Sequence, residues 1–290
     1  MKKITTIICA ALSINAALAQ VSVTEDNDIK NFRFGLKGDL SVDWMSPDND
    51  RKYLSNGVGV GYDWGMQMEF ALNKTTSVVT GLSLKSNTLK LDYHQASSAD
   101  EVIYVLDNDE EFVDLGTATT IDTSVFNSPN SGFKLLSRTI SANYVNIPLA
   151  LKMKTKEIGY LTYYGQFGAN IGINTRARAT DVVNNVSSFV DSTNTLTFAS
   201  GELTKEKLDV TKGVQPVRAG IQIGFGGEYN FSGNTSLLFG VFYNHYFTNA
   251  LRRESRESFL RYYDAIDAEW QNAGAKAIPG SVSLTVGILF

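Results

Sequence analysis

The chain has 290 residues, of which 43% are hydrophobic, 11% aromatic and 19% charged, and its formal net charge is −4. An acidic chain repels the phosphate backbone, so we expect no nucleic-acid partner. The 24 glycines against 5 prolines, together with the aromatic content, favour β-structure over a helical bundle.

Residues 1–19 have the form of a signal peptide. Two lysines precede the apolar segment 4–18, and Ala17-Leu18-Ala19 is a small-x-small cleavage site. Cleavage there leaves 24 basic and 30 acidic residues and removes Cys9, the single cysteine. We therefore predict an exported protein without an intramolecular disulfide. No apolar run of 18 residues follows, which excludes a bundle of membrane helices.

Alternation of apolar and polar residues begins at Phe32 and dominates the rest of the chain. Such a period of two is typical of strands whose two faces meet different surroundings. In the third segment the apolar parity changes near Ser86-Asn87, which predicts a β-bulge. The alternating segments are residues 32–44, 58–72, 78–93, 144–153, 161–173, 217–229, 237–243 and 278–290.

The connections between these segments are alternately short and long. Short ones lie around 73–74, 154–159 and 230–234, and long ones around 46–56, 95–138, 175–215 and 248–277. Outer-membrane barrels have short periplasmic turns and long extracellular loops. We predict an all-β fold, an eight-stranded antiparallel up-and-down transmembrane β-barrel over 32–290, preceded by a periplasmic segment over 20–31. The predicted location is the cell outer membrane, in contact with its lipid and lipopolysaccharide.

The polar face of the strands carries five basic and five acidic residues. Balanced charges suit a narrow lumen, because buried charges are tolerable only when they are paired. A tight register between the first two strands places Arg33 near Glu69 and Asp39 near Asp63. The candidates for lumen ion pairs are Arg33, Glu69, Lys37, Asp39, Asp63, Arg218 and Glu228.

Two of the long loops contain further ordered segments. Residues 102–106 are expected to extend the barrel wall above the membrane, and they could instead pair with 196–199 to give ten strands. Aromatic and apolar residues at helical spacing predict an amphipathic helix over 254–272. Candidate surface-contact residues are Arg252, Arg253, Arg256 and Arg261.

Three interpretations of this arginine group remain open. The arginines could bind lipopolysaccharide phosphates, for which guanidinium groups are well suited. The helix could also cap the barrel mouth or dock a partner. The favoured interpretation is a helix packed on neighbouring loops, with its arginines facing the acidic loop 100–114.

The sequence carries no recognisable catalytic or cofactor motif. His94 and His245 are the two histidines, and neither lies in a spacing typical of a nucleophile-base pair. The acidic loop lacks the EF-hand pattern of spaced ligands around a glycine. We predict no enzymatic activity, no cofactor and no metal.

Three segments, residues 32–38, 144–149 and 165–172, resemble the Bacteroidota-type outer-membrane β-barrel family that is often called PorT-like. The resemblance implies an eight-stranded barrel without a shared catalytic motif, and one branch of the family assists a secretion system. The alternating end of the chain, closing on Phe290, is similar to the C-terminal signal that barrel-insertion machinery reads.

We therefore predict a non-enzymatic integral outer-membrane protein that serves envelope organisation or surface interaction through its extracellular loops. The alternatives are an accessory of protein secretion and a narrow channel for small solutes. An eight-stranded barrel filled by side chains is expected to conduct poorly.

Overall fold

A computed structural model describes residues 32–47, 53–93, 101–113, 131–190, 195–232, 235–252, 260–264, 269–273 and 277–290. The predicted signal peptide 1–19, the segment 20–31 and His94 lie outside the described residues. Within the described ranges, no helix is long and apolar enough to cross a membrane.

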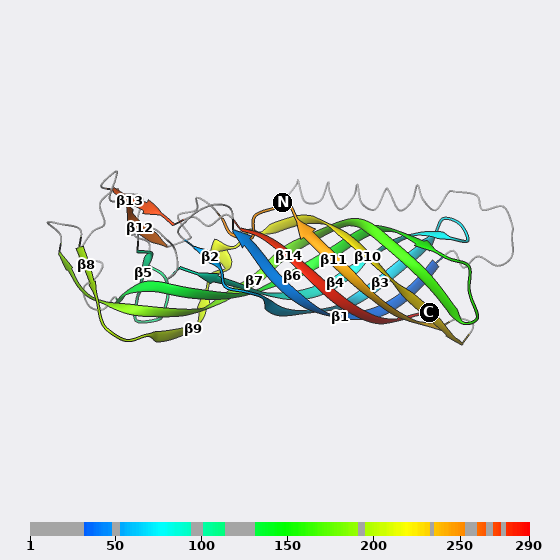
Figure 1. The fold of residues 1–290 in the computed structure, drawn as a ribbon, viewed down its shortest axis with the longest axis horizontal. Helices are drawn as coiled ribbons and strands as arrows, with labels where there is room; N and C mark the ends of the chain where they lie inside the picture. The colour runs from blue at the N-terminus through cyan, green and yellow to red at the C-terminus, as the bar shows by residue number, and fades with distance from the viewer. Residues whose placement is uncertain are drawn as a thin grey trace. The chain divides into compact units, whose positions relative to one another are not determined.

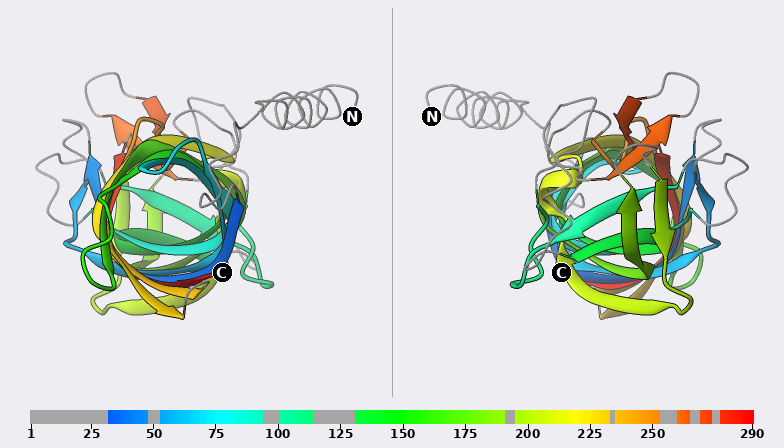
Figure 2. Two further views of the ribbon diagram at one scale, coloured as in Figure 1. Left: turned by 90° about the vertical axis from the view of Figure 1, so that its right-hand side faces the viewer. Right: turned by 90° about the vertical axis from the view of Figure 1, so that its left-hand side faces the viewer.

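Eight antiparallel strands form a closed ring, because β14 pairs with β11 on one side and with β1 on the other. The ring is visible from both ends in Figure 2. This confirms the predicted eight-stranded antiparallel barrel. The ring strands are β1 (Phe32–Pro47), β3 (Gly59–Ala71), β4 (Thr76–Asp92), β6 (Ser131–Lys154), β7 (Leu161–Val190), β10 (Val217–Ser232), β11 (Thr235–Tyr246) and β14 (Ala277–Leu289).

Strands β6 and β7 continue well past the other ring strands, paired as far as Phe133 and Asn185. Short elements lie toward the same end, on the left of Figure 1. We call the far ends of β6 and β7, together with these elements, the extension. Its short elements are β2 (Leu54–Ser55), β5 (Ile103–Leu106), β8 (Thr195–Phe198), β9 (Leu203–Asp209), η3 (Thr211–Gly213), β12 (Arg261–Asp264) and β13 (Glu269–Asn272).

The ring has its apolar face outside and its polar face inside. Leu40 and Val60 are 67% and 72% exposed, whereas Lys152 and Glu69 are 0% and 2% exposed. Water would strongly disfavour such a surface, but lipid hydrocarbon matches it. The alternation therefore gives a membrane-facing exterior and a charged lumen, as predicted.

The predicted bulge near Ser86-Asn87 is wrong. The register of β4 with β6 runs through this position without a shift, and the register of β4 with β3 is regular up to its last pair at Ser86. Odd-numbered residues stay inside along the strand, from Lys85 to Leu89 and Leu91. The apolar residues switch from outward to inward positions because the surroundings of the strand change. Below this level the outer face meets lipid, and above it the outer face meets water while the inside becomes an apolar core.

A bulge is present instead in β7. Asn143 pairs with Arg176, and Tyr144 pairs with Asn174, so Thr175 is the extra residue. The bulge turns Ala177 toward the interior of the extension. The buried core of the extension includes Met45, Tyr53, Leu89, Leu91, Tyr104, Phe133, Leu135, Ile140, Leu208 and Val214.

The predicted helix over 254–272 is also wrong where the structure describes it. Residues 261–264 and 269–272 form the antiparallel pair β12 and β13, in which Tyr263 lies opposite Trp270 with ring centroids 5.4 Å apart. A short helix is marginal on its own, whereas aromatic residues favour strands and gain from cross-strand pairing. The helical spacing of the apolar residues was therefore misleading.

Strand β5 confirms that residues 102–106 extend the barrel wall. It pairs with β6 and, through Ile103, with Arg261 of β12. Strand β8 pairs with β7 at a different place in the extension. The two segments do not pair with each other, so the ring keeps eight strands.

Candidate functional site

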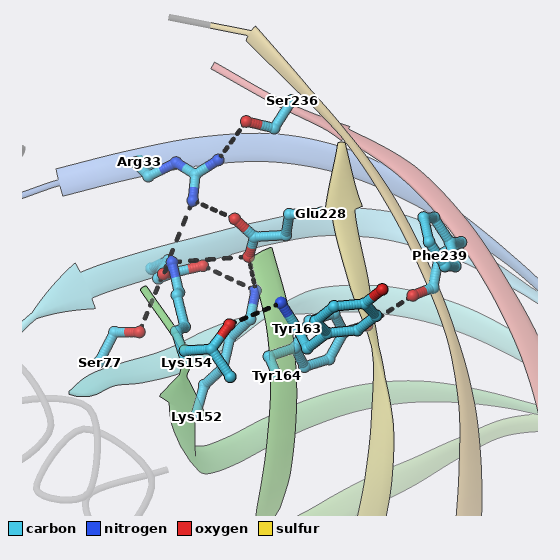
Figure 3. A network of polar contacts seen from close by, with 11 residues as sticks. Arg33, Ser77, Lys152, Lys154, Tyr163, Tyr164, Glu228, Ser236 and Phe239 are labelled. Atoms are coloured by element: carbon cyan, nitrogen blue, oxygen red, sulfur yellow. Dashed lines mark hydrogen bonds and ion pairs between the residues drawn. The ribbon is translucent and has the colours of Figure 1, made fainter. Parts of the chain in front are cut away.

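A cluster of five charged residues fills the lumen at the end with the short turns (Figure 3). The Nη1 group of Arg33 on β1 donates to Glu228 Oε2 of β10 at 2.6 Å, and Lys152 Nζ of β6 donates to Glu69 Oε2 of β3 at 3.0 Å. Lys152 also contacts Glu228, and Lys154 contacts Glu69. Three cations thus surround two carboxylates across the lumen. We call these five residues the lumen ion cluster.

The register of β1 and β3 places Arg33 opposite Glu69, with Nη1 and Oε1 3.9 Å apart. The stronger contact of Arg33 is with Glu228 on the far side of the lumen. Sequence reasoning missed Lys154, because the predicted strand ended at 153. Lys154 could have been found because it lies two residues after Lys152 and therefore faces the same side of the strand.

The next layer of the lumen contains Lys37, Asp39 and Asp63. Lys37 Nζ donates to Asp39 Oδ2 at 3.0 Å, and Asp63 Oδ2 accepts from the Ser83 hydroxyl at 3.1 Å. Asp39 lies opposite Asp63 in the strand register. A void of about 10 Å³ lies beside Lys37, which is at most the space of one water molecule. Side chains therefore fill this layer.

Tyr164 closes the lumen between these charged groups. Its hydroxyl donates to the Phe239 carbonyl at 3.2 Å, and Lys152 Nζ lies 4.3 Å from the centre of its ring. A Cβ atom at Gly226 or Gly240 would lie 2.6 or 2.5 Å from the Tyr164 hydroxyl. These two glycines leave room for a large side chain inside a narrow barrel.

Arg218 fills the layer at the top of the membrane-spanning ring. Its guanidinium lies 3.6 Å from the ring centre of Tyr144 and 4.3 Å from that of Tyr246. It donates to the side-chain oxygens of Asn87 and Asn146 at 2.7 and 3.2 Å. Within the described ranges, no salt bridge joins it to a carboxylate. Arg218 is therefore held by aromatic faces and amides and not by the ion pair that its charge suggested.

A second buried charge pair lies in the extension. Arg138 of β6 faces Asp181 of β7 in the strand register and binds it through two hydrogen bonds of 2.7 and 2.6 Å. Tyr104 and Phe112 each lie 5.6 Å from the guanidinium carbon. Burial opposes the charge of Arg138, but the Asp181 carboxylate outweighs burial and raises the pKa of Arg138. Sequence reasoning missed this pair because both residues fell in predicted loops.

Above the Arg218 layer, the extension encloses a cavity of about 580 Å³. Burial raises the pKa of Tyr93, in its wall, to about 12, which indicates a poorly solvated surface there. Four basic and three acidic residues line it, together with several apolar ones. The lining residues used below are Glu110, Glu111, Arg138, Ile140, Arg176, Asp209, Val210, Thr211, Lys212, Val214, Leu251, Arg252, Leu260 and Ala273.

Of the four predicted surface arginines, the structure describes Arg252 and Arg261. Arg252 lines the cavity, and its backbone N–H donates to the Gly213 carbonyl at 2.9 Å. Arg261 is only 5% exposed and contacts Asn272 across the β12–β13 pair, so it is not a surface-contact residue. Arg253 and Arg256 lie outside the described residues.

The described residues offer no arrangement for metal or histidine chemistry. No group of three or more His, Cys, Asp or Glu residues in these ranges is placed to hold a metal ion. His245 lies on the outer face of β11 between the rings of Tyr243 and Phe247, at centroid distances of 6.4 and 5.8 Å.

Phe290 completes the seam between the two ends of the barrel. Its N–H donates to the Phe34 carbonyl at 2.7 Å, its carbonyl accepts from the Phe34 N–H at 3.3 Å, and the two rings stack at 6.1 Å. The side chain is 51% exposed on the apolar face. The proposed role of Phe290 as an insertion signal stays a prediction.

Deletion of Phe290 is expected to reduce the amount of folded protein in the outer membrane several-fold. The deletion removes both the last hydrogen bonds of the seam and the terminal ring. Heat-modifiable mobility of outer-membrane fractions measures the effect. The variant Phe290→Ala keeps the backbone bonds, so a similar loss in it assigns the effect to the ring. Full insertion of the truncated chain would contradict the prediction.

Comparisons with known proteins agree with the barrel architecture. A family model described as "Outer membrane protein beta-barrel domain" matches residues 18–252, which include all ring strands except β14. No curated protein matches the chain significantly in sequence.

Several solved structures are also similar to the chain. Ail, the attachment invasion locus protein of Yersinia pestis, is 10% identical, with 89% of this chain and 98% of Ail covered and a TM-score of 0.34. Neisserial surface protein A is 11% identical, with coverages of 88% and 95% and a TM-score of 0.37. The outer membrane protein OprG from Pseudomonas aeruginosa is 10% identical, with coverages of 90% and 96% and a TM-score of 0.40.

Proposed function

We propose a role for this chain from one premise, that it belongs to the family of outer membrane protein beta-barrel domains. The chain is an integral outer-membrane protein, exported by its signal peptide, with a closed lumen and no enzymatic activity. It acts at the cell surface, where the extension contacts lipopolysaccharide or a surface partner. The short turns face the periplasm and the extension faces outward.

The filled lumen is the observation that supports this role over that of a channel. The lumen ion cluster, Tyr164 and the Arg218 layer lie at successive levels of the ring. Glu69, Lys152 and Glu228 of the cluster are buried, as are Tyr164 and Arg218, while Arg33 and Lys154 are only 13% and 14% exposed. Opening a path would break contacts between buried charges, and each uncompensated charge would cost several kcal/mol. The barrel therefore serves as a rigid membrane anchor for the extension.

Planar-bilayer recording of the purified chain tests the closed lumen. We expect no steady single-channel steps, because the charged and aromatic layers leave no continuous aqueous path. A 16-stranded porin recorded in the same bilayers shows that the assay detects open barrels. Reproducible conductance steps from the chain would contradict the proposal and favour a narrow solute channel.

The PorT-like subtype is part of this proposal. Three segments support it, and the alternation in them buries Asn146 and Gln166 in the lumen, where Arg33 binds Glu228. Within the described ranges, no feature favours the secretion-accessory role over surface contact. Affinity capture from detergent-solubilised cells separates the two roles, since recovery of secretion components would favour the accessory.

A further inference from the structure

We propose that the extension cavity is a binding site for a small amphipathic anion, a molecule with an apolar body and one carboxylate, sulfonate or phosphate group. The cavity measures about 580 Å³, which falls within the range of small-molecule sites. This inference goes beyond the proposed function, because the site needs no macromolecular partner.

The inner wall of the cavity is apolar. Ile140, Val214 and Leu260 are buried in the core of the extension and also line the cavity, with Val210 and Leu251 beside them. An apolar group placed here is removed from water, and it covers no polar side-chain atom of these residues. This part of the site therefore accepts the body of a ligand and not its charged group.

Two of the three acidic lining residues already have partners. Glu110 Oε1 accepts from Lys205 Nζ at 2.9 Å, and Asp209 Oδ1 accepts from the Thr211 N–H at 2.9 Å. Contact with the side chain and backbone of Thr211 lowers the pKa of Asp209, so this carboxylate stays ionised in its present contacts. These two residues therefore offer little to a cationic ligand.

Two basic lining residues, in contrast, remain available at the mouth. The side chains of Arg176 and Lys212 are exposed, and within the described ranges neither side chain makes a hydrogen bond or a salt bridge, although the charge of Arg176 contributes to the lowered pKa of Asp209. Arg138 adds a third cation in the wall, fixed in place by Asp181. A carboxylate or phosphate at the mouth would receive charge-assisted hydrogen bonds, which are the strong ones. The site thus combines an apolar floor with cations at its opening.

The cavity does not continue into the lumen. Along β6 the inward residues run from Arg138 and Ile140 at the cavity to Ala142 and then to Tyr144, which lies against Arg218. The Arg218 layer closes the ring below the cavity. The site therefore holds a ligand on the cell-surface side and does not pass it through the membrane.

Calorimetric titration of the full chain in lipid nanodiscs tests the proposal. Octanoate is the probe. Acetate is the control that lacks the apolar body, and octyltrimethylammonium is the control that carries the opposite charge. Heats from empty nanodiscs are subtracted. We expect saturable binding of octanoate. Octyltrimethylammonium should bind at least tenfold more weakly, because it cannot accept hydrogen bonds from the cations at the mouth. Acetate should show no measurable binding, because it has no apolar body to bury against the inner wall.

Three variants locate the site. The double variant Arg176→Gln/Lys212→Gln removes the free cations and is expected to weaken octanoate binding by about tenfold or more. Arg178→Gln is the matched control, because Arg178 is exposed on the same strand outside the cavity lining, and its affinity should stay within about twofold. Ala273→Phe fills the cavity and should abolish binding while the barrel keeps its heat-modifiable mobility.

Several results would overturn the proposal. Absence of saturable octanoate binding would do so, as would equal affinity for octyltrimethylammonium or unchanged affinity in the double variant. The bilayer recordings are independent of these titrations. If the barrel does not conduct and does not bind octanoate, the ligand site is wrong and the proposed function stands. If the barrel conducts and binds octanoate, the proposed function is wrong and the ligand site stands.

Discussion

The variant Glu228→Gln is expected to lower the free energy of unfolding of the barrel by about 3–5 kcal/mol, the usual cost of breaking a buried ion pair by removing one partner. Glu228 accepts contacts from Arg33, Lys152 and Lys154, and it is 5% exposed. Its loss leaves three cations around one carboxylate. Urea unfolding in lipid vesicles, followed by tryptophan fluorescence, measures the effect.

Two companion variants make this prediction specific. Glu157→Gln makes the same chemical change at an exposed site, where Glu157 accepts from Asn230 Nδ2 at 3.3 Å, and it should cost less than about 0.5 kcal/mol. Adding Lys154→Gln to Glu228→Gln restores the charge balance and should recover part of the loss. A Glu228→Gln barrel as stable as the parent would show that the lumen ion cluster does not hold the barrel together.

The ring and its charged interior could be predicted because one rule governs them. Every second residue faces lipid, so the lipid face is continuously apolar and the lumen face carries the charges. Pairing within the lumen was harder to predict. Strand register placed Arg33 opposite Glu69, but the close contact with Glu228 crosses a closed ring between strands that are far apart in sequence. The spacing of Arg33 and Glu228 along the sequence does not predict their contact across the lumen.

The extension could not be predicted, because its strands obey a different rule. Above the membrane the outer face of the wall meets water and the inner face meets an apolar core. The apolar residues therefore change from even to odd positions at Leu89 and Leu91, which in the sequence looks like a bulge. The charges of Arg138 and Asp181 suggested solvated loops, yet the two residues form a buried salt bridge between β6 and β7. Likewise, the spacing of Tyr262 and Trp270 suits a helix, but pairing with a neighbouring strand decides the outcome.

The variant Asp181→Asn should unfold the extension while the membrane ring stays closed. It leaves the Arg138 charge buried beside Tyr104, with its bidentate partner gone, and the expected local cost is about 3–5 kcal/mol. The membrane-spanning parts of the ring strands keep their hydrogen bonds and their lipid contacts, because only the far ends of β6 and β7 belong to the extension. Limited proteolysis on intact cells should therefore cut within the extension much faster than in the parent, with unchanged heat-modifiable mobility of the ring.

The variants Glu206→Gln and Arg138→Leu/Asp181→Leu separate a charge effect from a packing effect. Glu206 is exposed on β9, so its substitution should leave the proteolysis rate unchanged. The double variant replaces both charges with apolar groups inside an apolar core, which is often neutral or stabilising, and it should regain most of the protection. If Asp181→Asn left the proteolysis rate unchanged, the buried pair would not stabilise the extension. If it abolished the folded ring as well, the extension and the ring would unfold as one unit, and a closed membrane anchor carrying an independently packed surface site would be the wrong description of this chain.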